Sequence, residues 1–86
     1  MAKLNCEIVT PDKLYFQGEA NMVVVPGLYG SLGFLSGHIP LVSPLGEGNV
    51  YVTDTLSSAE GKSFKIQGGY VEFKNDKVII LAEHVE

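Results

Sequence analysis

Short segments in which apolar and polar residues alternate recur along this chain, and they constrain its fold more than any other feature of the sequence. Leu4, Cys6 and Ile8 fall on one side of such a segment, and Phe64 and Ile66 fall on one side of another. Alternation with a period of two is typical of a β-strand that is buried on one face. No segment has a convincing helical period, so the sequence predicts an all-β fold.

Turn residues separate these segments at intervals of about 8–12 residues, which is typical of a β-sandwich or barrel. The run 78–82 is apolar throughout, so we expect an inner strand covered on both faces. Asn75 and Asp76 predict a two-residue hairpin, because both tolerate the positive φ of a type I′ turn. Residues 27–44 are expected to be irregular. The expected strands are 4–10, 14–17, 20–25, 49–54, 63–67, 70–74 and 78–82, with turns at 11–13, 18–19, 57–61 and 68–69.

Length and charge narrow the classes of partner. The 86 residues suit one domain, 1–86, and 45% hydrophobic residues suit a packed core. The net charge is -4, and the scattered lysines form no basic face for nucleic acid or anionic lipid. No apolar run approaches the ~20 residues of a membrane span, and the N-terminus does not resemble a signal peptide. Cys6, the only cysteine, is expected to be a buried hydrophobe in a reducing compartment.

His38 is the residue that most suggests catalysis, but its neighbours do not support that role. A Ser-His pair needs a third orienting group, and Ser36 on an extended segment would point away from His38. His84 lies in what we expect to be a frayed tail, so a zinc site is not expected. The glycines between residues 27 and 33 lack the lysine and the helix of a phosphate loop. We therefore expect no enzyme activity, cofactor or metal, and a structural or interface role for His38.

The irregular stretch is too apolar for a freely solvated loop. Some of its large side chains must fold inward, and the others would form an exposed patch of the kind that marks a partner site. The alternative is that all of them lie in the core. These residues are Leu28, Tyr29, Leu32, Phe34 and Leu35.

Residues 30–41, which read Gly-Ser-Leu-Gly-Phe-Leu-Ser-Gly-His-Ile-Pro-Leu, resemble a hallmark of the epsilon subunit of F-type ATP synthases. Residues 48–50, 66–73 and 78–83 are similar to further family segments and keep their order and spacing. The resemblance implies a two-sheet β-sandwich of roughly ten strands. It also implies a non-catalytic rotor subunit that couples the c-ring to the gamma subunit during ATP synthesis, on the cytoplasmic face of a bacterial inner membrane.

The resemblance also implies two contact sites. By position, Gly30, Ser31 and Leu32 correspond to the family's loop at the c-ring, although Ser31 stands where the family often has an acidic residue. Contact with the membrane would occur only through that ring. The residues that correspond to a region near gamma are His38, Ile39, Pro40, Leu41 and Val42.

The family usually continues into a two-helix hairpin, and the sequence ends at Glu86 without one. The resemblance then implies no ATP binding and no inhibition by helices. One alternative is a sandwich that binds a sugar or a peptide, for which Tyr51 and Tyr70 are the candidate exposed aromatics. Another is a biotinyl or lipoyl carrier, but its lysine should occupy a hairpin tip, whereas Lys74 and Lys77 flank the expected turn.

Overall fold

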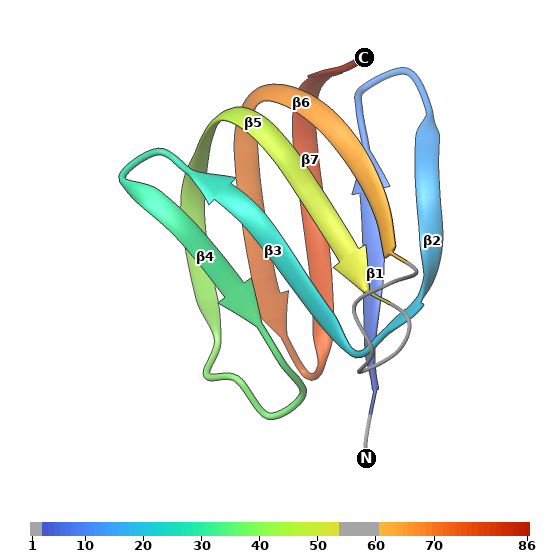
Figure 1. Cartoon of the computed structure of the whole chain (residues 1–86), viewed down its shortest axis with the longest axis vertical. Coiled ribbons are helices and arrows are strands. Elements are labelled where there is room, and N and C mark those ends of the chain that lie inside the picture. The colour runs from blue at the N-terminus through green and yellow to red at the C-terminus, as the bar shows by residue number, and fades with distance from the viewer. Residues whose placement is uncertain (1–2, 54–60) are drawn as a thin grey trace.

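A computed structural model describes residues 3–53 and 61–86, and those residues form strands and turns without any helix (Figure 1). No helix long and apolar enough to cross a membrane is therefore present among them. The turn expected at 57–61 lies almost wholly outside the described residues. The strands are β1 (Leu4–Val9), β2 (Leu14–Ala20), β3 (Met22–Gly27), β4 (Gly30–Phe34), β5 (Leu41–Thr53), β6 (Gly61–Lys74) and β7 (Lys77–Val85).

The strands form one hydrogen-bonded sheet that curls over itself, so that its inner side encloses the core (Figure 1). The strand order is β2-β1-β7-β6-β5-β3-β4. The pair β1–β7 is parallel, and the other neighbouring pairs are antiparallel. The curled sheet gives two packed layers, which confirms the predicted all-β sandwich.

The strand count is seven, whereas the family resemblance implied roughly ten. Two of the seven strands run through bends that the sequence suggested were breaks or irregular segments. β5 has 13 residues and β6 has 14, and both arch over the top of the molecule from one layer to the other (Figure 1). Gly68 has φ 64 and Gly69 has φ 122 within β6. Glycine adopts these left-handed conformations without a Cβ clash. The predicted strands 63–67 and 70–74 are therefore two halves of one strand.

Two other boundaries were wrong. The stretch expected to be irregular contains β4 and the start of β5, because these segments pair with β3 and β6. The turn expected at residues 18–19 lies inside β2, and the chain turns at Asn21. Gly18 pairs with Cys6, and a Cβ on Gly18 would lie 3.3 Å from the Phe16 ring. This glycine therefore leaves room for an aromatic side chain and does not end the strand.

The core consists of inward-facing side chains from alternate strand positions. Leu4, Cys6 and Ile8 are fully buried as predicted, and so are Val71 and Phe73 to within 1%. Each such aliphatic or aromatic side chain stabilises the fold by about 1.5–3 kcal/mol. Burial, with a smaller contribution from the adjacent Glu7 carboxylate, raises the pKa of the Cys6 thiol to about 12. Cys6 therefore behaves as a neutral core residue.

Strand β7 differs from prediction in two respects. It is an inner strand, but Leu81 on its outer side is 50% exposed, so the strand is covered on one face only. The expected frayed tail is also wrong. His84 pairs with Gln67, Val85 is 6% exposed, and the Glu86 N–H donates to the Lys65 carbonyl at 2.9 Å. The apolar Val85 anchors the end of the strand in the core.

The hairpin between β6 and β7 has the predicted geometry. Lys74 pairs with Lys77, so the connecting loop has two residues. Asn75 has φ 52 and Asp76 has φ 57, the positive values that a type I′ turn requires at both positions.

Candidate functional site

The first candidate contact surface is the tip of the β3–β4 hairpin. Gly27 pairs with Gly30, and a Cβ on Gly27 would collide with the Gly30 carbonyl oxygen. The tight turn between them leaves Leu28 54% exposed and Tyr29 91% exposed. The Leu28 N–H donates to the Pro44 carbonyl at 3.0 Å, which braces the tip against β5. The tip is therefore apolar, exposed and held by the sheet.

The three residues predicted to touch the c-ring begin β4 at this tip. Gly30 and Ser31 are exposed, whereas Leu32 is partly buried and packs against the core. Leu32 thus anchors the hairpin, and the prominent side chains are those of Leu28 and Tyr29. The prediction did not assign these two residues to the ring contact, although an aromatic residue beside the turn glycine was a usable signal.

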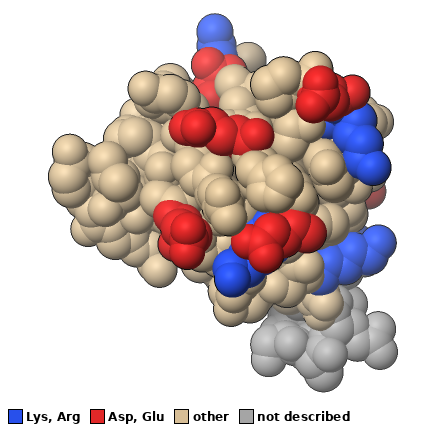
Figure 2. Space-filling model, turned by 90° about the horizontal axis from the view of Figure 1, so that it is seen from above, with Lys and Arg blue, Asp and Glu red and all other residues tan. Residues whose placement is uncertain are grey.

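The long segment of the chain that contains this tip has no charged residues. Residues 20–46 contain no Asp, Glu, Lys or Arg. In Figure 2 the left end of the molecule, where the β3–β4 hairpin projects, shows no charged side chain, whereas acidic and basic side chains intermingle over the rest of that face. A partner of this tip would therefore be recognised by shape, apolar contact and hydrogen bonding.

The second candidate surface is the loop 35–40, which joins β4 to β5. The His38 N–H donates to the Leu35 carbonyl at 3.2 Å and closes a turn. Gly37 has φ 87, a conformation that favours glycine at the third position of a type II turn. From the β6–β7 hairpin, the Asp76 carboxylate accepts a hydrogen bond from the Ser36 hydroxyl at 2.9 Å and another from the Gly37 N–H at 2.7 Å.

His38 is an internal support of this loop. Its ring meets the Phe34 ring edge-on at a centroid distance of 5.0 Å and the Phe73 ring at 5.4 Å. Its Nδ1 lies 2.7 Å from the Ile39 carbonyl oxygen. Edge-to-face ring contacts and this hydrogen-bond distance fix the ring orientation. This geometry fits the structural role expected for His38.

The other residues predicted to face gamma divide by exposure. Ile39 is 73% exposed, Val42 is 64% exposed, and Pro40 is also exposed. Leu41 turns inward and packs against the core. A contact at this loop would therefore rest on Ile39, Pro40 and Val42, with Leu41 and His38 holding them in place. The alternative that the whole apolar stretch is buried is wrong, since Leu35 is 53% exposed while Phe34 is fully buried.

Val42 also belongs to a wider apolar area, here called the outer apolar face, which the sequence analysis did not find. Directly paired residues on neighbouring strands project on the same side of a sheet. Tyr70 pairs with Pro44 and with Leu81, and Leu81 pairs with Val9. Tyr70 is 58% exposed and Leu81 50%. The members of the face are Val9, Val42, Pro44, Tyr70, Ile79 and Leu81.

A shallow groove of about 290 Å³ crosses this face between the end of β1 and the bend of β6. Tyr70 and Leu81 form part of its wall, and Pro11 and Glu83 close it. An exposed apolar area of this kind is a candidate contact site.

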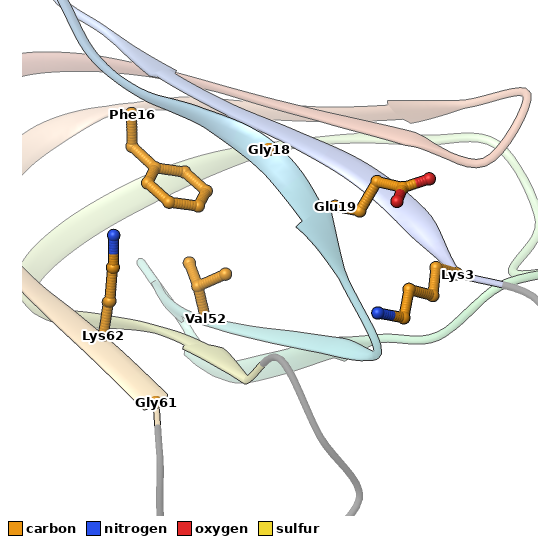
Figure 3. A pocket seen from close by; sticks show the side chains of 7 residues that line it. All are labelled: Lys3, Phe16, Gly18, Glu19, Val52, Gly61 and Lys62. Atoms are coloured by element: carbon orange, nitrogen blue, oxygen red, sulfur yellow. The ribbon is translucent and has the colours of Figure 1, made fainter.

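A larger pocket, of about 570 Å³, lies between β2 and the ends of β5 and β6 (Figure 3). Phe16 and Lys62 point toward each other, with the Lys62 ammonium 5.4 Å from the ring centroid. Lys3 and Glu19 line the opposite side. Side chains of opposite charge share its lining. No ligand site is assigned to this pocket.

The two candidate contact surfaces stand at opposite ends of β4, with the hairpin tip at one end and the loop 35–40 at the other (Figure 1). β4 has five residues, so the surfaces are about 16 Å apart along the strand. Both are uncharged and both are attached to the same packed core. This arrangement suits a rigid body that joins two partners.

The sequence of residues 3–86 matches the family described as ATP synthase, Delta/Epsilon chain, beta-sandwich domain. The chain belongs to this family. The match covers nearly the whole chain and confirms the resemblance drawn from residues 30–41, 48–50, 66–73 and 78–83.

Individual proteins similar to this chain carry the name ATP synthase epsilon chain. The chain is 41% identical over 86 residues to the ATP synthase epsilon chain of Brevibacillus brevis, covering 100% of this chain and 64% of that one. It is 44% identical over 79 residues to the ATP synthase epsilon chain of Chlorobaculum tepidum, covering 92% of this chain and 88% of that one. The chain thus spans a little under two thirds of the first relative and most of the second.

Solved structures of mitochondrial ATP synthases contain the same fold. A chain in the Euglena gracilis structure of OSCP, F1 and c-ring superposes with a TM-score of 0.87 at 19% identity, over 100% of this chain and 54% of that one. A chain in the Tetrahymena thermophila central stalk and c-ring structure superposes with a TM-score of 0.76 at 18% identity, over 99% and 66%. At such identities the likeness establishes the sandwich fold.

A carrier domain would present a lysine at a hairpin tip, and the β6–β7 hairpin does not do so. The tip of the β6–β7 hairpin is formed by Asn75 and Asp76, and Lys74 and Lys77 flank it as predicted. The Lys77 ammonium forms an ion pair with the Glu7 carboxylate at 2.9 Å. Within residues 3–53 and 61–86, no three His, Cys, Asp or Glu side chains gather as metal ligands.

Proposed function

We propose that this chain is a non-catalytic central-stalk subunit that couples the c-ring to the gamma subunit in a proton-translocating F-type ATP synthase. The observation that carries the proposal is the pair of uncharged contact surfaces at opposite ends of β4, on one continuous sheet. A coupling subunit must transmit torque without deforming, and a close-packed sandwich has the low compressibility that this requires. Membership of the delta/epsilon family, and relatives named ATP synthase epsilon chain, support the same role.

For the c-ring we propose the hairpin tip formed by Gly30, Ser31 and Leu32, extended by Leu28 and Tyr29. Tyr29, at 91% exposure, offers a large apolar ring with one hydroxyl. Ser31 supplies a hydroxyl where an acidic side chain would supply a charge. The contact would depend on packing and on neutral hydrogen bonds, and it would respond weakly to salt.

For gamma we propose the loop 35–40 together with the outer apolar face. Ile39, Pro40 and Val42 offer exposed apolar side chains, and His38 and Leu41 hold them from inside. A long-lived interface combines apolar contacts with polar groups. Glu72 pairs with both Val42 and Ile79 within this face, and Glu83 lines its groove. We further propose that the chain lies on the cytoplasmic face of a bacterial inner membrane and touches the membrane only through the c-ring.

A ligand-binding or peptide-binding module is the second candidate function. The groove beside Tyr70 and Leu81 favours it, because a small apolar segment would fit there. The same side chains continue into Val42 and Pro44 across paired strands. That continuity extends the apolar area beyond the groove, which suits a protein surface, so the rotor role takes precedence.

Co-purification with the gamma subunit of the same organism tests the proposed function. The wild-type chain should form a stable one-to-one complex. Ile39→Asp places a charge on a side chain that is 73% exposed, so it should abolish the complex without unfolding the domain. Leu14→Asp, on an edge-strand residue that is 50% exposed, is the matched control and should bind normally. A folded wild-type chain that fails to bind gamma at micromolar concentration would reject the rotor role in favour of the binding module.

A further inference from the structure

We propose that Asp76 is a positioning residue, which holds the loop 35–40 in the conformation that presents Ile39 and Pro40 to a protein partner. The inference rests on the proposed gamma contact. It assigns part of the interface to the β6–β7 hairpin, which contributes no exposed apolar side chain at its tip. The Asp76 carboxylate of this hairpin contacts a loop that lies 39–40 residues away in sequence, and this contact motivates the inference.

The Asp76 carboxylate uses both oxygens on this loop. Oδ2 accepts from the Ser36 hydroxyl at 2.9 Å, and Oδ1 accepts from the Gly37 N–H at 2.7 Å. Hydrogen bonds to an ionised acceptor are shorter and stronger than neutral ones. A two-point attachment also fixes the direction of the loop.

The loop depends on this attachment because its own backbone restrains its conformation only weakly. The turn bond from the His38 N–H to the Leu35 carbonyl is long, at 3.2 Å. Gly37 has φ 87, and glycine adopts many other conformations equally well. Residues 35–40 carry no Asp, Glu, Lys or Arg, so the loop has no charge partner of its own. Ordering by Asp76 therefore removes conformational entropy before a partner binds.

The turn itself does not require a carboxylate at this position. Asp76 has φ 57, and Asn-Gly is the preferred sequence for a type I′ turn. A glycine would therefore fit the hairpin better than the aspartate does. The two hydrogen bonds to the loop 35–40 therefore account for an aspartate at this position.

Because glycine suits this turn position, a glycine substitution tests the role of the carboxylate without disturbing the hairpin. Asp76→Gly keeps or improves the hairpin and removes both hydrogen bonds to the loop. We expect the Gly37 amide to exchange with solvent at least about tenfold faster in this variant, with the amides of β6 and β7 unchanged. If the binding-competent loop falls to about one tenth of the population, the dissociation constant for the co-expressed gamma subunit rises about tenfold.

Asn75→Gly is the matched control, since it places glycine at the neighbouring turn position and keeps the Asp76 carboxylate. It should leave both Gly37 exchange and gamma binding unchanged. Asp76→Asn keeps an oxygen that can accept from Gly37 and should partly restore binding relative to Asp76→Gly.

The outcomes separate the two proposals. Wild-type gamma affinity in a folded Asp76→Gly variant would refute the positioning role and leave the proposed function intact. Unchanged Gly37 exchange would refute it as well. A wild-type chain that does not bind gamma at all would refute the proposed function and, with it, the partner-facing role of Asp76.

Discussion

The rings of Phe34 and Phe73 stack with centroids 5.5 Å apart and planes 4° from parallel. Phe34 ends β4 and Phe73 lies near the end of β6, so the pair joins the two layers of the sandwich beneath the loop 35–40. Because the His38 ring rests edge-on against both, the order of this loop is linked to the packing of the core.

Phe34→Leu should therefore destabilise the whole domain. Replacing the ring leaves unfilled space among fully buried neighbours, and we expect a loss of about 1–2 kcal/mol in the free energy of unfolding. Urea unfolding measures it. Phe16→Leu is the control, because Phe16 is only partly buried and should lose less. Equal losses at the two positions would contradict the structural account.

The Gly69→Ala change should be costly. Gly69 has φ 122, and a Cβ there would collide with the Leu81 carbonyl oxygen and lie 2.9 Å from Ala82 Cα. Strain and backbone displacement should lower the free energy of unfolding by about 3 kcal/mol or more. Gly33→Ala is the control, because a Cβ at Gly33 meets nothing within 4 Å, and it should change stability by less than about 1 kcal/mol. A tolerated Gly69→Ala would show that β6 does not bend through this residue.

Cys6 should be inert in the folded protein. Its side chain is fully buried and its pKa is raised to about 12, so at pH 8 only about one thiol in 10⁴ is ionised. A thiol reagent at pH 8 should label the native chain orders of magnitude more slowly than the urea-unfolded chain. Rapid labelling under native conditions would mean that β1 opens readily.

The contribution of Asp76 to stability should depend on pH. The Gly37 N–H, and then the Ser36 hydroxyl, lower the pKa of the Asp76 carboxyl below its ordinary value of 3.8. The unfolded chain therefore binds this proton more readily than the folded one, so stability rises with pH in this window. The advantage of wild type over Asp76→Asn should be complete above the unfolded pKa and disappear as pH falls through the folded pKa. Urea midpoints from pH 6 to pH 2.5 measure it, and a constant difference would exclude the linkage.

Leu81→Lys should weaken gamma binding more than Leu14→Lys. Both leucines are 50% exposed and both lie on strands, but only Leu81 belongs to the outer apolar face. A charge in the middle of an apolar contact must be desolvated, so the dissociation constant should rise by about tenfold or more. Titration of each folded variant with gamma compares the two. Equal affinities would remove this face from the proposed interface.

The sequence by itself determined several of the side chains that enter the core and the position of one turn. Leu4, Cys6 and Ile8 are buried because a strand places alternate residues on opposite faces, a property of local geometry. The Asn75-Asp76 turn followed from the tolerance of these residue types for positive φ. The family resemblance was likewise visible in residue order and spacing.

Only the tertiary structure decided which segments pair and which apolar faces stay uncovered. Gly69 bends a continuous strand where the sequence suggested an end, because β5 and β7 pair with it on both sides. Leu81 is half exposed because no layer covers that side of β7 among the described residues. Asp76 reaches Ser36 across 40 residues of chain. Such contacts depend on how distant segments meet, and local periodicity carries no information about that.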